Sequence, residues 1–159
     1  MPVVVIPRNP STATSSNVLV SSATFTSTPP VDPATVTGDP VDPSLSGLAI
    51  RIVRNTVTGN MVLCPVGALP EDKPQSFYGF LTGAGGTGIV VATGRGSIVT
   101  PRVEGAVPLI PDADVYLART PGYVTQDTDT SEDHAQLRVG VAIDTTRIVL
   151  ATDFRLNYF

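Results

Sequence analysis

Residues that usually carry chemistry are scarce in this chain. Its 159 residues include one cysteine, one histidine and no tryptophan, and only 15% of them are charged. A lone cysteine, Cys64, excludes an internal disulfide framework and a cysteine-rich zinc site, and a lone histidine, His134, excludes a histidine-rich metal site. No G-x-S-x-G string offers a serine nucleophile on a strained turn. We therefore expect a protein that is not an enzyme and that uses neither a metal nor another cofactor.

The low charge of the chain also limits the kinds of partner that it can bind. The net charge is -4, and the basic residues are scattered arginines with a single lysine, Lys73. Phosphate binding needs clustered basic residues, so we expect no nucleic-acid partner. No run approaches the roughly 18 apolar residues of a membrane span, and residues 1–8 hold too few apolar residues for a secretory signal, so no membrane partner is expected. So little charge indicates that part of the surface contacts another protein.

Two segments match chemical motifs only formally. Residues 83–88 satisfy G-x-G-x-x-G, but they lead into the apolar run 89–91 instead of a helix, so a hairpin loop is the better interpretation. Residues 126–134 gather four carboxylates and the histidine but lack the central glycine and distal glutamate of an EF-hand, so a solvated acidic loop is favoured over a metal site. Cys64 lies in an apolar run and is predicted to be a small buried residue.

Residues 1–47 differ in composition from the rest of the chain. They contain one basic residue, Arg8, many serines and threonines, and most of the prolines. Proline fixes φ and removes a backbone donor, so this segment predicts an extended arm, with the two Pro-Val-Asp-Pro sequences at 30–33 and 40–43 as stiff spacers. Apolar patches at 3–6 and 18–20 are suited to add as edge strands to a neighbouring subunit. The alternative is a disordered, solvated tail.

Residues 48–159 alternate short apolar runs with Gly, Pro, Asn and Asp, which is typical of an all-β sandwich or barrel. Strands are predicted at 48–54, 60–64, 75–81, 88–93, 96–108, 114–118, 122–125, 137–143 and 147–152. No window shows a helical apolar stripe free of Gly or Pro, so helix is expected only as one short turn near residues 68–72.

Part of this region contains the same strand-loop-strand pattern twice. The strand 61–63 corresponds to 115–117, the glycine-containing strand 77–81 to 139–142, and the strand 89–91 to 148–150. The offset grows from 54 (Leu63 to Leu117) to 61 (Gly79 to Gly140), as unequal loops between matching strands would produce. A duplicated strand-loop-strand unit indicates a scaffold.

Four motifs follow one another between residues 96 and 142: GSIVTPRVEGAVP at 96–108, DVYL at 114–117, GYVT at 122–125 and RVGVA at 138–142. Together they resemble the capsid cement, or head decoration, proteins of tailed bacteriophages, whose pattern is V-R-V-E-G-V, a loop, V-Y, G-x-V-T, then V-G-x-A. The chain departs from the short members of that family in its long arm. The resemblance implies a small β-barrel or β-tulip-like body at residues 48–159, with residues 1–47 as the arm.

The resemblance also implies a function. The protein would be a structural virion protein, assembled in the host cytoplasm, that decorates and stabilises the outer capsid surface by bridging neighbouring major capsid subunits. It would be a homo-oligomer, with a trimer favoured over a dimer. The expected capsid-binding residues are apolar residues and one arginine of the arm: Val3, Val4, Val5, Ile6, Arg8, Val18, Leu19, Val20, Val31 and Val41.

A phage head-fibre, tail or baseplate module that binds a host-surface receptor or glycan is the alternative function. Such a module would present aromatic residues on loops, and the candidates are Tyr78, Tyr123, Tyr158 and Phe159. Tyr78 and Tyr123 lie beside strand glycines, where an aromatic side chain more often has a packing role.

Overall fold

The computed structural model describes residues 17–20, 24–27, 32–85, 88–128, 135–151 and 157–158. Across these residues the chain is built from strands, and helical structure is confined to three-residue 3₁₀ turns. The predicted all-β class is therefore confirmed. The short turn expected near residues 68–72 is the 3₁₀ turn η4 (Pro70–Asp72).

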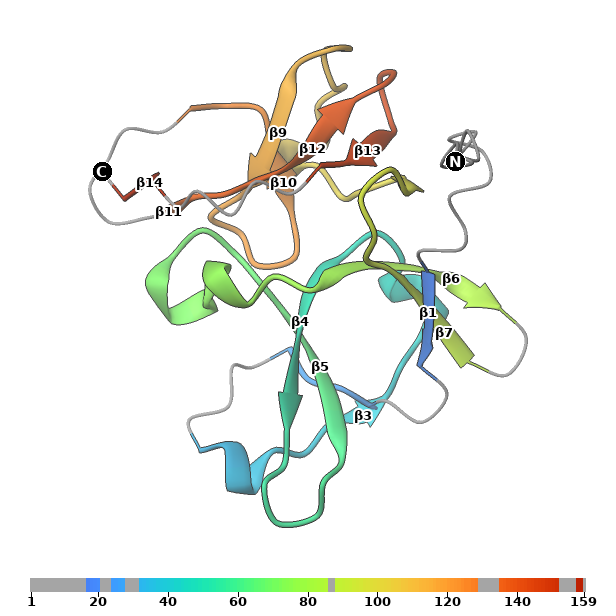
Figure 1. The fold of residues 1–159 in the computed structure, drawn as a ribbon, viewed down its shortest axis with the longest axis vertical. Coiled ribbons are helices and arrows are strands. Elements are labelled where there is room, and N and C mark those ends of the chain that lie inside the picture. The colour runs from blue at the N-terminus through green and yellow to red at the C-terminus, as the bar shows by residue number, and fades with distance from the viewer. Residues whose placement is uncertain are drawn as a thin grey trace, which may run out of the picture.

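Seven strands form the larger sheet, which curls into a half-barrel (Figure 1). Their order across the sheet is β1 (Asn17–Val20), β7 (Gly88–Ala92), β6 (Gly79–Gly85), β4 (Ala49–Arg54), β5 (Met61–Pro65), β2 (Thr24–Phe25) and β3 (Asp39–Pro40). Neighbouring strands are antiparallel except β2 and β5, which are parallel.

Five strands form the smaller sheet, which lies above the larger one in Figure 1. Their order is β10 (Val124–Thr125), β9 (Asp114–Leu117), β12 (Arg138–Ala142), β13 (Ile148–Leu150) and β8 (Ile98–Val99). A two-stranded sheet pairs β11 (Ala135–Gln136) with β14 (Asn157–Tyr158).

The seven-stranded and five-stranded sheets share one hydrophobic core. Phe80 and Ala92 of the larger sheet belong to the same buried cluster as Val115, Val139 and Ile148 of the smaller sheet. Burial of a large aliphatic or aromatic side chain stabilises a fold by about 1.5–3 kcal/mol, so this shared cluster holds the sheets together.

A chain of backbone hydrogen bonds also crosses from one sheet to the other. Gly47 N–H donates to Leu81 O of β6 (2.6 Å), and Arg102 N–H donates to Gly47 O (3.0 Å). Val124 N–H of β10 in turn donates to Arg102 O (2.8 Å). Residues 100–103 therefore form a connection between the sheets rather than part of a long strand.

The two predicted repeat units share a hairpin but differ in one pairing. β6–β7 and β12–β13 are both antiparallel pairs, and a Cβ added at either Gly79 or Gly140 would stand 2.3 Å from a carbonyl oxygen of the partner strand. The preceding strands are placed differently. β9 pairs directly with β12, whereas β4 separates β5 from β6.

One predicted strand is shorter than expected, and another is shifted along the chain. The strand predicted at 96–108 is confined to Ile98–Val99, because Pro101 lacks a ladder donor and residues 104–106 form the 3₁₀ turn η6 (Glu104–Ala106). Gly105 and Ala106 both have positive φ in this turn, 71° and 53°. The strand predicted at 75–81 begins only at Gly79, since the 3₁₀ turn η5 (Pro74–Ser76) precedes it.

Parts of residues 1–47 belong to the larger sheet. Val18, Leu19 and Val20 lie in β1, which pairs with β7, and β2 and β3 pair at the opposite edge of the sheet. Val41 packs against the buried cluster that includes Leu48. The remaining residues predicted to bind the capsid lie outside the described residues: Val3, Val4, Val5, Ile6, Arg8 and Val31.

The Pro-Val-Asp-Pro sequences, predicted as extended spacers, each end in a turn that the prediction did not include. The second proline of each starts a 3₁₀ turn, η2 (Pro33–Thr35) or η3 (Pro43–Leu45). The preceding Asp32 and Asp42 each accept a 2.9 Å hydrogen bond from a backbone N–H of the turn. An acidic cap followed by proline at the first position is a favourable start for a helical turn. Asp32 itself keeps the extended backbone expected before proline, with φ -124° and ψ 119°.

Candidate functional site

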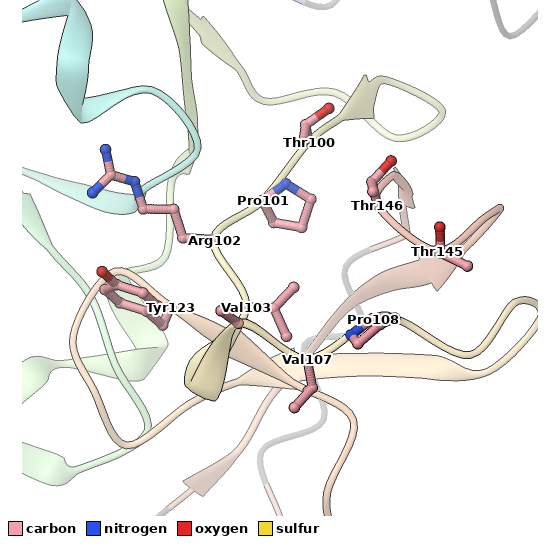
Figure 2. Close-up of a pocket in the computed structure, with 10 residues that line it drawn as sticks. Thr100, Pro101, Arg102, Val103, Val107, Pro108, Tyr123, Thr145 and Thr146 are labelled. Carbon is pink, nitrogen blue, oxygen red and sulfur yellow. The ribbon is translucent and has the colours of Figure 1, made fainter.

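A groove of about 470 Å³ lies where residues 100–108 pass between β10 and the turn that joins β12 to β13. Figure 2 shows Tyr123 on one side of it, Thr145 and Thr146 on the other, and Pro101 and Val103 between them. Its lining is largely apolar and consists of Thr100, Pro101, Arg102, Val103, Ala106, Val107, Pro108, Tyr123, Thr145 and Thr146. An apolar groove with a few polar groups is the usual form of a binding site.

The charge of Arg102 serves the fold instead of the groove. Its side chain points away from the groove in Figure 2. Its Nε donates to Ser46 O (3.0 Å) and its terminal nitrogen donates to Ser44 O. The guanidinium therefore fastens residues 44–46 to the connection between the sheets, and a ligand in the groove would meet mainly apolar surface.

An apolar face continues from the groove onto the surface. We define it by Val107, Ile110 and Ile143, whose side chains are 58%, 67% and 39% exposed. Leu109 N–H donates to Thr145 O (2.9 Å) and Asp112 N–H donates to Ala142 O (2.8 Å). Residues 109–112 therefore run beside residues 142–145, which places Ile110 and Ile143 on neighbouring backbone segments.

The backbone of the apolar face is fixed by the Gln126 side chain, which makes the same pair of hydrogen bonds that a neighbouring strand would make. The Gln126 amide accepts a 2.7 Å hydrogen bond from Ile110 N–H and donates a 2.9 Å hydrogen bond to Ile110 O. Ordering a loop before it binds lowers the entropy cost of association. Exposed aliphatic residues on a hydrogen-bonded loop are therefore well suited to contact a protein partner.

The β12–β13 turn beside the groove is organised by Asp144. Its carboxylate accepts hydrogen bonds from Thr146 N–H (2.9 Å), Arg147 N–H (2.8 Å) and Arg147 Nε (2.7 Å). These donors, the Thr146 backbone first, lower the pKa of Asp144 to about 2. The carboxylate is thus committed to the turn and ionised at neutral pH.

Three buried polar residues lie close together on β4, β5 and η4. Arg51 and Cys64 face each other on β4 and β5, and Asp72 lies close to them; all three are buried. Burial raises the pKa of the Cys64 thiol, while Arg51 opposes the shift. Burial and the neighbouring Glu71 raise the pKa of Asp72. The prediction that Cys64 is a small buried residue is confirmed, and its thiol is not available as a surface nucleophile.

The segments that matched motifs formally can now be placed. Residues 83–88 span the β6–β7 hairpin, with Gly85 opposite Gly88, so the hairpin interpretation is confirmed. Of residues 126–134 only 126–128 are described, and His134 lies outside the described residues. Within the described ranges, no three His, Cys, Asp or Glu side chains come together as metal ligands, and no helix has the length and apolar character to cross a membrane.

The groove and the apolar face consist of other residues than those expected from the sequence to bind the capsid, and that expectation stays a prediction. The predicted contacts were in the arm, whereas Val107, Ile110 and Ile143 were not singled out. A signal was present in the run Val-Pro-Leu-Ile-Pro at 107–111, where prolines bracket apolar residues that cannot continue a strand. Among the aromatic candidates, Tyr78 and Tyr123 both pack against the core, and Tyr123 also lines the groove. Tyr158 is described only as part of β14, and Phe159 lies outside the described residues.

Comparison of the chain with protein-family models, with curated proteins and with solved structures finds no match. Its function is therefore inferred from its own residues and their arrangement.

Proposed function

We propose that this chain is a structural virion protein that decorates the outer surface of a tailed-phage capsid and stabilises it by bridging neighbouring major capsid subunits. One observation carries the proposal. The four motifs on which the resemblance rests contribute β8, β9, β10 and β12, and all four strands belong to the same five-stranded sheet. This sheet is therefore the part of the fold to which the resemblance applies.

The apolar face gives the proposed clamp a surface for the coat protein. Val107, Ile110 and Ile143 are exposed and uncharged, and the centres of protein interfaces are depleted of charge. The arm supplies a second contact in this proposal, through Val3, Ile6 and Arg8. Many copies bound to one shell turn a modest affinity per copy into a large combined effect. Such a clamp needs no catalytic group.

Binding to heads tests the proposal. Purified protein is mixed with expanded, undecorated phage heads, and the bound fraction is measured by co-sedimentation over a range of concentrations. We expect saturable binding that falls at least tenfold in affinity for Ile110→Asp, a loss of about 1.4 kcal/mol or more. The matched control is Val57→Asp, since Val57 is 80% exposed on the β4–β5 turn, away from the apolar face.

Both substitutions replace an exposed aliphatic residue, so each should change the free energy of unfolding by no more than about 0.5 kcal/mol. A loss of head binding without a loss of stability would therefore report on the contact itself. Absence of saturable binding by the unmodified protein contradicts the proposal. Equal binding by both variants contradicts the role of the apolar face.

A receptor- or glycan-binding module of a head fibre, tail or baseplate is the second candidate. The observation in its favour is that Tyr123 lines the groove, where an aromatic ring could stack on a sugar. Packing of Tyr78 against the core leaves fewer exposed aromatic residues than the sequence suggested. Binding to host cells or to a glycan array, abolished by Tyr123→Ala while head binding is absent, would favour this candidate over decoration.

A further inference from the structure

The outer edges of the two larger sheets are not equally protected. An unpaired strand edge offers a row of backbone donors and acceptors to any strand of another molecule, and proteins usually guard it with proline, charge, a bulge or a covering segment. Three of the four edge strands are guarded in the described part of the chain. β3 carries Asp39 and Pro40, and β8 is two residues long and is followed closely by Pro101.

The third guarded edge is β10, which is covered from within the chain. Val103 forms a parallel bridge with Val124, and Val124 N–H donates to Arg102 O (2.8 Å). The connection between the sheets therefore occupies this edge.

Among the residues that the structure describes, nothing gives β1 any of these protections. Its four residues, Asn17–Val20, pair with β7 in an unbroken register without a bulge, and no other described segment pairs with β1. Residues 9–31 contain no charged residue, and residues 11–28 contain no proline. Figure 1 shows β1 beside β7 at the end of the larger sheet. β1 is thus the longest and least protected of these four edges.

Symmetry indicates what fits this edge. Neighbouring residue pairs in an antiparallel ladder alternate between hydrogen-bonded and non-hydrogen-bonded types, and a two-fold axis cannot exchange one type for the other. A strand that pairs with its own copy about such an axis must therefore place one residue directly opposite itself. A charged residue there would face an identical charge, which is destabilising. The uncharged composition around β1 removes that obstacle.

We infer that two copies of this chain associate through β1, with the two strands antiparallel about a two-fold axis, so that the larger sheets of both copies become one continuous sheet. The contact uses the larger sheet, whereas the apolar face proposed to contact the capsid belongs to the smaller one. The inference therefore does not rest on the proposed virion role. It assigns Val18, Leu19 and Val20, which were expected from the sequence to bind the capsid, to contact between copies instead. A four-residue pairing is short, so the association is expected to be reversible and to depend on protein concentration.

The mass in solution is the first test. Sedimentation equilibrium of the full chain should show the mass rising with concentration from 16.5 kDa towards twice that value. Leu19→Glu places a charge on the edge and should shift the dimer midpoint at least tenfold to higher concentration. Val57→Glu, on the exposed β4–β5 turn, should leave the midpoint unchanged. Circular dichroism of both variants shows whether each remains folded.

Cysteine crosslinking locates the contact and does not depend on the effect of a charge. Cys64 is the sole cysteine and is fully buried, so it does not compete with an introduced thiol. Single cysteines are placed at each of the four positions of β1, with Val57→Cys as the exposed control. Facing residues in an antiparallel pair have Cα atoms about 4.5–5.5 Å apart, within the range of a disulfide.

We expect one β1 position, the one opposite itself, to give a disulfide-linked dimer under mild oxidation, with its immediate neighbours at least tenfold less reactive. A chain that stays monomeric at every concentration overturns the inference. So does a dimer in which no β1 cysteine crosslinks faster than Val57→Cys. Crosslinking of β1 cysteines to coat protein on heads, without crosslinking between copies, would assign this edge to the coat protein and also overturn it.

Discussion

Replacing Gly140 by alanine tests the closest backbone approach within the smaller sheet. The added Cβ would stand 2.3 Å from Val149 O, and because this atom is backbone, no side-chain rotation relieves the contact. β12 and β13 would have to separate locally by 1.1 Å, from 2.3 Å to the 3.4 Å at which ordinary van der Waals contact begins.

A separation of that size weakens the ladder beside it. The hydrogen bond from Ala151 N–H to Val139 O is 3.1 Å long and would be stretched beyond hydrogen-bonding distance. A lost backbone hydrogen bond costs about 1 kcal/mol and overpacking costs about 1–3 kcal/mol, whereas alanine returns roughly 0.5 kcal/mol by restricting the unfolded chain. We therefore expect Gly140→Ala to lower the free energy of unfolding by roughly 1.5–3.5 kcal/mol.

Urea unfolding followed by far-UV circular dichroism measures this loss, since the chain has no tryptophan to report by fluorescence. Gly67→Ala is the matched control, because its Cβ would meet its nearest atoms at 3.2–3.3 Å, where small shifts of the neighbours suffice. It should cost less than about 1 kcal/mol. Gly79→Ala repeats the test in the larger sheet, where the Cβ would lie 2.3 Å from Ala92 O. Equal urea midpoints for the Gly140 and Gly67 variants would refute the predicted contact.

Three further predictions concern single residues. The carboxyl of Asp144 should titrate by NMR with a midpoint near its pKa of about 2. The ionised carboxylate stabilises the fold above pH 3.8, its ordinary pKa, and this stability is lost as the pH falls towards 2. A midpoint near 3.8 would contradict its role in the turn. Because burial raises the pKa of Asp72, the folded state holds this proton more tightly than the unfolded state, and stability is lost as the pH rises above 3.8. In urea unfolding, the free energy of unfolding of Asp72→Asn relative to that of the unmodified protein should therefore be higher at about pH 7 than at about pH 4. The opposite trend would contradict the shift in pKa. Phe80→Ala should cost about 3–5 kcal/mol in the same assay, because Phe80 is fully buried in the core shared by both sheets, and a loss below about 1 kcal/mol would contradict that placement.

Local patterns in the sequence predicted most of the strands correctly. The run 49–54 alternates β-branched residues with arginine and forms β4, and the apolar runs 88–92 and 148–150 form β7 and β13. In each case the spacing of apolar residues and the flanking Gly, Asn or Asp decide the outcome within a few residues. Prediction failed at 96–108, where the strand-like Val-Glu-Gly-Ala-Val sequence is interrupted by a turn with positive φ that the apolar pattern does not reveal.

Long-range pairing could not be predicted in the same way. The correspondence between the repeat units was visible as sequence, but the insertion of β4 between β5 and β6 depends on which edges meet during folding. The same holds for β1, whose apolar run was identified while its partner β7, far along the chain, was not. The apolar face was missed for a related reason: the backbone of Ile110 is hydrogen-bonded by Gln126, sixteen residues later, and the local sequence does not reveal this contact.

The apolar face and the β1 edge lie on different sheets, and this separation makes these two contacts independently testable. The apolar face belongs to the loops of the smaller sheet, whereas β1 is an edge of the larger sheet. If both contacts exist, Ile110→Asp should leave association between copies unchanged while weakening binding to heads. Leu19→Glu should leave the intrinsic affinity for a single site on the head intact but remove the gain that a dimer obtains from binding two sites at once. A variant of one surface that abolished both activities would instead indicate a single shared interface, and the assignment of separate roles to the two sheets would be wrong.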